Sequence, residues 1–67
     1  MIYEYKGRDK NGDRYDVSYD AQKKEATVFR GGEHVDDVRL FFENGLNTIR
    51  IQRGTEKIIV EYICSSN

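Results

Sequence analysis

The sequence is poor in the residues that staple or break small domains. Among its 67 residues there is no proline, and Cys64 and His34 are the single cysteine and the single histidine. One cysteine excludes a disulfide within the chain, and one histidine leaves too few ligands for a Cys/His zinc site. Domains of this length bury only about 60% of their unfolded surface, so many of them rely on such staples. We therefore expect no metal and no cofactor, and either a well-made core or burial supplied by a second copy or a partner.

Charge and hydropathy are also without extremes. Lys and Arg number 11, Asp and Glu number 12, and the net charge is −1. This balance argues against nucleic-acid binding driven by bulk charge and against a polybasic membrane anchor. The longest apolar runs, 40–42 and 58–60, have three residues each, whereas a transmembrane helix needs about 20. The first residues lack the layout of a signal peptide, so we expect a complete, cytoplasmic gene product with a reduced thiol and no membrane contact.

Apolar and polar residues alternate with a period of two along most of the chain, which is typical of β-strands. Short turn signals interrupt this alternation five times: 11–12, 21–24, 31–32, 44–45 and 54–55. The sequence therefore predicts an all-β fold, a six-stranded antiparallel meander that forms a small barrel or a strongly curled sheet. It is predicted to be a single domain over 1–67, with the last three or four residues as a flexible tail.

Turn lengths predict the strand registers of the N-terminal half. Asn11-Gly12 suits a three-residue loop closed by a glycine bulge, because Gly12 accepts a positive φ. With the later turns at 21–24 and 31–32, apolar pairs fall on one face and an opposite-charge pair on the other. The predicted pairs are Tyr5–Val17, Tyr3–Tyr19, Lys6–Asp16, Tyr19–Ala26, Val17–Val28 and Val28–Val35.

Turn lengths also predict the strand registers of the C-terminal half. A two-residue turn at Asn44-Gly45 and another at Gly54-Thr55 align three strands whose apolar residues share a face. The predicted pairs are Leu40–Ile49, Val38–Ile51, Ile51–Ile58 and Ile49–Val60, with Phe41 opposite Thr48 and Leu46 opposite Ile63. The predicted core consists of Val17, Val28, Leu40, Ile49, Ile51, Ile58 and Val60.

The segment around Asp36-Asp37 leaves an alternative open. Val35 and Val38 have opposite parity, so a bulge or a break must lie between them. Residues 36–44 also fit a short helix that Asp36 caps and that ends before Gly45. That alternative is an α+β fold of three strands, a helix at 36–44 and two strands.

No catalytic arrangement is visible, and we expect that the protein is not an enzyme. His34, the one imidazole, lies beside a glycine turn and is best explained as a solvated residue. Glu33, Asp36 and Asp37 lack the alternating spacing and closing glutamate of a calcium loop.

The tyrosines suggest an alternative function. All five lie on the core face of the predicted register, which is explained by a small core with hydroxyls at its rim. Four of them, Tyr3, Tyr5, Tyr15 and Tyr19, gather on the first hairpin among basic residues, as in platforms that stack single-stranded nucleic acid. Interleaved aspartates cancel that positive field, so nucleic-acid binding remains the alternative.

The face opposite the core carries more apolar residues than solvent exposure explains. Phe29, Phe41, Ile59 and Ile63 point away from the predicted core, and several such residues together indicate a contact surface. Glu33, Asp36, Asp37 and Glu43 are predicted as its acidic rim. The leading hypothesis is a non-enzymatic protein-binding module that contacts another protein or itself as a homodimer. Small proteins of this kind often regulate or inhibit a larger protein, and phages and mobile elements are a natural source of them.

Overall fold

The computed structural model describes residues 1–66, and this part of the chain forms seven antiparallel strands without a helix. The all-β prediction is confirmed, and the alternative helix at 36–44 is wrong, because 39–43 are a strand. The strands are β1 (Ile2–Arg8), β2 (Arg14–Asp20), β3 (Glu25–Arg30), β4 (Glu33–Val35), β5 (Arg39–Glu43), β6 (Thr48–Arg53) and β7 (Glu56–Ser66).

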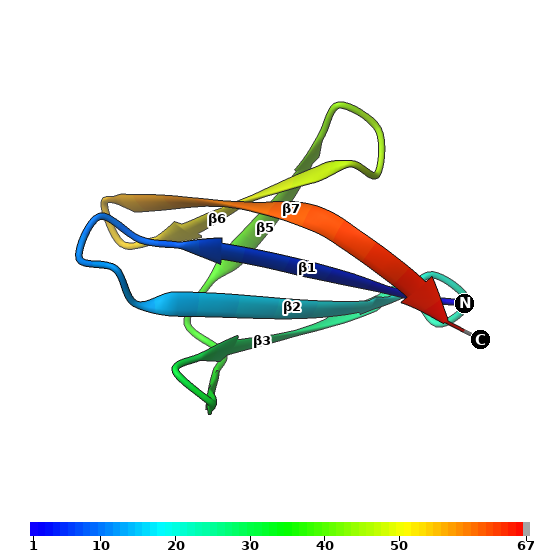
Figure 1. Cartoon of the computed structure of the whole chain (residues 1–67), viewed down its shortest axis with the longest axis horizontal. Helices are drawn as coiled ribbons and strands as arrows, with labels where there is room; N and C mark the ends of the chain where they lie inside the picture. The colour runs from blue at the N-terminus through cyan, green and yellow to red at the C-terminus, as the bar shows by residue number, and fades with distance from the viewer. Residues whose placement is uncertain (67) are drawn as a thin grey trace.

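All seven strands belong to one strongly curled sheet with the order β4-β3-β2-β1-β7-β6-β5 (Figure 1). The first and last strands are neighbours inside the sheet, so its two edges are β4 and β5. These edges follow one another along the chain and are joined by residues 36–38 alone. Both edges therefore start from a common corner, and the sheet is a half-barrel that stays open between them.

The break at Asp36-Asp37 explains why there are seven strands where six were predicted. Residues 33–43 were expected to form one strand with a bulge or break where the side-chain parity changes. In the structure the chain leaves β4 after Val35 and enters β5 at Arg39. The predicted break exists, and it separates two strands at opposite edges of the sheet.

Four of the five hairpin registers match the predictions. The first turn closes as expected, with the Asp9 backbone N–H donating to the Asp13 carbonyl at 3.0 Å and Gly12 at a φ of 87°. Asp9 reinforces this turn, because its Oδ1 accepts the backbone N–H groups of Asn11 and Asp13 at 2.9 Å. The confirmed pairs are Tyr5–Val17, Tyr3–Tyr19, Lys6–Asp16, Tyr19–Ala26, Val17–Val28, Val28–Val35, Ile51–Ile58 and Ile49–Val60.

The register between β5 and β6 differs from the prediction by two residues. Leu40 lies opposite Ile51 and Phe42 opposite Ile49, because residues 44–47 form a four-residue turn in which Asn47 N–H donates to the Asn44 carbonyl. Phe41 is thus opposite Arg50 and not Thr48, and Leu46 lies in the turn and not opposite Ile63. A shift of two positions keeps every side chain on its predicted face.

The concave face of the half-barrel carries the core. Six of the seven predicted core residues are buried, and Leu40 is half-buried against them. Two tyrosines of the first hairpin join them, since Tyr5 and Tyr15 keep 1% and 0% of their surface. The buried set is Tyr5, Tyr15, Val17, Val28, Ile49, Ile51, Ile58 and Val60.

Side chains meet across the concave face, which is direct evidence of the curl. The ring of Phe42 on β5 packs 4.8 Å from the ring of Tyr19 on β2, although three strands separate β5 and β2 in the sheet. Nearer the corner, an Arg53 Nη1 on β6 donates to the Tyr15 hydroxyl on β2 at 3.5 Å. The sheet therefore folds over its own core.

β1 and β7 approach each other closely at Gly7. A Cβ at this position would overlap the carbonyl oxygen of Ile59 and crowd the Val60 side chain. Glycine at a core-facing strand position is typical of such close backbone approach. Gly7 therefore lets the first and last strands join.

β7 extends to Ser66, close to the end of the chain. A bulge leaves Ile63 as an extra residue between the pairs Glu4–Cys64 and Tyr5–Tyr62, and Ser65 and Ser66 pair with Tyr3 and Ile2. A flexible tail was expected over the last three or four residues, but residues 64–66 belong to the strand. Asn67, the remainder of that tail, lies outside the described residues.

Within residues 1–66, no helix has the length and apolar character required to span a bilayer.

Candidate interaction surface

Two of the predicted contact residues lie in one row across the outer face of the sheet. Arg50 on β6 is directly opposite Phe41 on β5 and directly opposite Ile59 on β7. Phe41 and Ile59 remain 39% and 46% exposed. Adjacent strands are about 4.8 Å apart, so the three side chains form one continuous strip. We call Phe41, Arg50 and Ile59 the outer-face patch.

Arg50 is held in place at the centre of this patch. Its Nε donates to Glu43 Oε2 at 3.0 Å, and its Nη1 donates to Gln52 Oε1 at 3.4 Å. Its guanidinium carbon lies 4.5 Å from the centroid of the Phe41 ring, which is a cation–π contact. The outer-face patch thus combines two apolar side chains with a positioned cation, and a partner meets it with little ordering cost for the arginine.

The other two predicted contact residues lie elsewhere. Phe29 is on β3, near the opposite edge of the sheet, where its ring packs 5.7 Å from that of His34. Ile63 is the extra residue of the bulge in β7. Both are exposed, but neither is in the row of Phe41, Arg50 and Ile59. The structure therefore brings two of the four residues together.

The predicted acidic rim is also divided. Glu43 borders the outer-face patch through its ion pair with Arg50, and Asp37 pairs with Arg53 at 3.2 Å. Glu33 is on β4, and Asp36 lies in the segment that follows it. Two of these four carboxylates are thus partly neutralised by arginines of β6.

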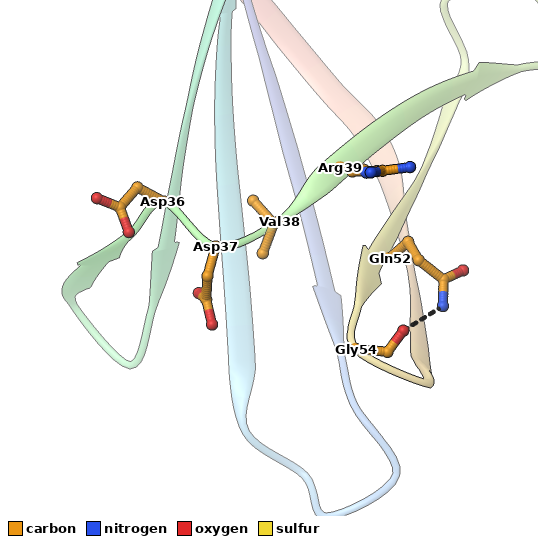
Figure 2. Close-up of a pocket in the computed structure, with 6 residues that line it drawn as sticks. All are labelled: Asp36, Asp37, Val38, Arg39, Gln52 and Gly54. Carbon is orange, nitrogen blue, oxygen red and sulfur yellow. Dashed lines mark hydrogen bonds between the residues drawn. The ribbon is translucent and has the colours of Figure 1, made fainter.

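A groove of about 450 Å³ opens at the corner between β4 and β5 (Figure 2). It is lined by residues 36–39 together with Gln52 and Gly54, and Gln52 Nε2 donates to the Gly54 carbonyl at 2.8 Å. The Asp36 and Asp37 side chains point in different directions in Figure 2. Among residues 1–66, no three His, Cys, Asp or Glu side chains gather closely enough to hold a metal ion. The corner thus offers hydrogen-bonding groups without converging on one point.

The alternative aromatic platform divides between the core and its rim. Tyr5 and Tyr15 are buried, so neither ring presents a face to a base, whereas Tyr3 and Tyr19 are half-buried. Tyr3 and Tyr19 belong to a cluster of aromatic rings on the concave face. Its ring centroids are 4.8–6.5 Å apart between packed neighbours, and its members are Tyr3, Tyr5, Tyr19, Phe42 and Tyr62.

Tyr5 ties the turn at 44–47 to this cluster. Its hydroxyl donates to the Leu46 carbonyl at 2.7 Å, over a sequence separation of 41 residues. Burial, reinforced by the neighbouring Tyr3, Tyr19 and Tyr62, raises the pKa of Tyr5 above its ordinary value of 10.0. The cluster therefore acts first as packing, with Phe42 and Tyr62 exposed at its margin.

Sequence reasoning missed two features that bear on binding. Arg50, at the centre of the outer-face patch, was not singled out, because its place beside Phe41 depends on the four-residue turn. The free edge of β5 was also missed, because 33–43 reads as one strand. The charges at the two ends of β5, Arg39 and Glu43, were the available signal for that edge.

Comparisons of the chain with protein-family models, with curated proteins and with solved structures found no match.

Proposed function

We propose that the chain is a small protein-binding module whose contact surface is the outer-face patch. One observation supports this most strongly: Phe41 and Ile59 flank an arginine that three contacts hold in place. Aromatic and arginine side chains are the residues enriched at the centres of protein interfaces.

The energy available at the outer-face patch is modest. Full burial of a large apolar side chain contributes about 1.5–3 kcal/mol. Phe41 and Ile59 keep 39% and 46% exposure, so covering both recovers on the order of 2 kcal/mol. A partner must therefore add hydrogen bonds or charge pairs, and Arg50 within the patch and Glu43 beside it supply groups for them.

Paired substitutions test this function. Phe41→Asp with Ile59→Lys places two charges on the patch, and both sites are exposed, so the variant should fold. Phe29→Asp is the matched control, because Phe29 is similarly exposed at the other side of the sheet. We expect the double variant to lose association in sedimentation velocity and in cross-linking within native cell extract, while the control keeps it.

Two results would contradict the proposal. One is a double variant that melts far below the parent, since that would place Phe41 and Ile59 in the core. The other is a double variant that associates as strongly as the parent and the Phe29→Asp control.

A further inference from the structure

β5 is an edge strand that lacks lysine, proline and a bulge. Only β6 is hydrogen-bonded to it within residues 1–66, so alternate backbone N–H and C=O groups along its other side have no strand partner. Natural edge strands are commonly blunted by lysine, proline or a bulge. β5 consists of Arg-Leu-Phe-Phe-Glu and pairs with β6 without a bulge. It is therefore a ready template for another strand.

The sequence of β5 is complementary to itself when the strand is reversed. Around a two-fold axis through Phe41, Arg39 of one copy meets Glu43 of the other, and this ion pair occurs twice. Leu40 meets Phe42, also twice, and Phe41 meets its own copy. Partners lie an even number of positions apart, so each pair shares a face of the sheet and a hydrogen-bonding direction.

We infer that β5 pairs antiparallel with β5 of a second copy, so that two half-barrels form one continuous sheet. This inference rests on the proposed function and names its partner, a second copy of the chain. The interface is isologous, as in most dimers of a single chain. The two outer-face patches then meet at the axis, with one Phe41 ring beside the other and an Arg50 over each.

Charge selects this register over its neighbours. Moving the axis to Leu40 places Arg39 opposite Phe41, and moving it to Phe42 places Glu43 opposite Phe41; both lose the two ion pairs. Arg39 forms no ion pair within residues 1–66, so its charge is available. Glu43 accepts Arg50 at Oε2, and its side chain stays 47% exposed, so Oε1 is open to the second copy.

The other edge of the sheet lacks these properties. β4 has three residues, Glu33-His34-Val35, and reversal about its centre places Glu33 opposite Val35. A strand this short offers few backbone groups. The self-pairing is thus specific to β5, and because only five residues a copy take part, the dimer should be weak and form at high protein concentration.

Charge reversal tests the register directly. Arg39→Glu alone places glutamate opposite Glu43 twice, and Glu43→Arg alone places arginine opposite Arg39 twice. Each variant should weaken self-association in sedimentation equilibrium by roughly tenfold or more. An equimolar mixture of the two should recover the parent's dimer, because every opposed pair is then of opposite sign. Lys57→Glu and Glu25→Arg are the matched controls, since both make the same charge changes at exposed positions away from β5, and both should dimerise like the parent.

Three results would overturn the inference: a parent that stays monomeric throughout, single variants that dimerise like the parent, or a mixture no more dimeric than its components. Circular dichroism checks that each variant folds. If a charge-reversal variant does not fold, the glutamine substitution at the same position, Arg39→Gln or Glu43→Gln, replaces it. If the protein associates but these charge changes have no effect, only the β5 register is wrong. The Phe41→Asp/Ile59→Lys variant tests the proposed function by itself.

Discussion

Ile58, Ile59 and Val60 follow one another in β7, yet their side chains end in different surroundings. Ile58 and Val60 face the concave side and keep 1% and 0% of their surface, whereas Ile59 faces outward and keeps 46%. The same contrast holds along β5, where half-buried Leu40 lies beside Phe41 of the outer-face patch. One face of the sheet therefore maintains the fold, and the other carries the exposed residues on which the proposed function rests. Apolar composition alone does not distinguish the two roles, because only strand parity separates them.

The largest expected effect lies on the concave face. Val60→Ala removes two methyl groups from a fully buried site, and Ile49→Ala removes more, so each should lower the free energy of unfolding by about 2–5 kcal/mol. Ile59→Ala, one position away on the outer face, should change it by no more than about 0.5 kcal/mol. Urea titrations of the three variants check this, and similar losses at positions 59 and 60 would show that both faces are packed.

The next effect concerns the junction that lets the sheet curl. Gly7→Ala introduces a Cβ that overlaps the Ile59 carbonyl oxygen, so β1 and β7 must move apart. Overpacking of this kind typically costs about 1–3 kcal/mol. Gly12→Ala is unsuitable as a control because Gly12 has a positive φ. The control is Ala26→Gly, which changes a single methyl group at an exposed position. Thermal melting compares them, and a Gly7→Ala variant as stable as the parent would contradict the close approach of the two strands.

The smallest effect is the pH dependence of the tyrosine cluster. Tyr5→Phe removes a hydrogen bond to the Leu46 carbonyl and should cost about 0.5–1.5 kcal/mol at neutral pH. Because the folded pKa of Tyr5 is raised above 10.0, its contribution is fully present below that pH. As the pH rises further, the unfolded chain releases the proton first, so stability falls until the folded pKa is passed. Denaturant melts at increasing alkaline pH should show this fall in the parent and a shallower one in Tyr5→Phe; equal slopes would exclude Tyr5 as its source.

Much of this contrast between the faces is predictable from sequence, because short turns determine registers. Asn11-Gly12, Gly31-Gly32 and Gly54-Thr55 each permit few loop lengths, and the pairs they imply occur in the structure. Asn44-Gly45 begins a four-residue turn as readily as it makes a two-residue one. The strand registers that these two turn lengths produce differ by two positions and leave the same residues on each face. The hydrophobic pattern therefore does not distinguish between them.

The candidate site was less predictable, because it depends on which strands become edges. The parity change at Asp36-Asp37 predicts a break, but local sequence does not say that the chain passes there from one edge of the sheet to the other. Phe29 and Phe41 are both outward-facing by parity, and only the strand order places them apart. Gly7 was a usable signal that was missed, since glycine at a core-facing strand position indicates close backbone approach.

Residue-resolved amide hydrogen exchange at several protein concentrations tests most directly whether the free edge of β5 pairs with a second copy. We predict that alternate amides of 39–43 become more protected as concentration rises, while those of 49–51, which are paired with both β5 and β7, do not change. Exchange in β5 that is independent of concentration, from dilute to concentrated protein, would contradict pairing of this edge with a second copy.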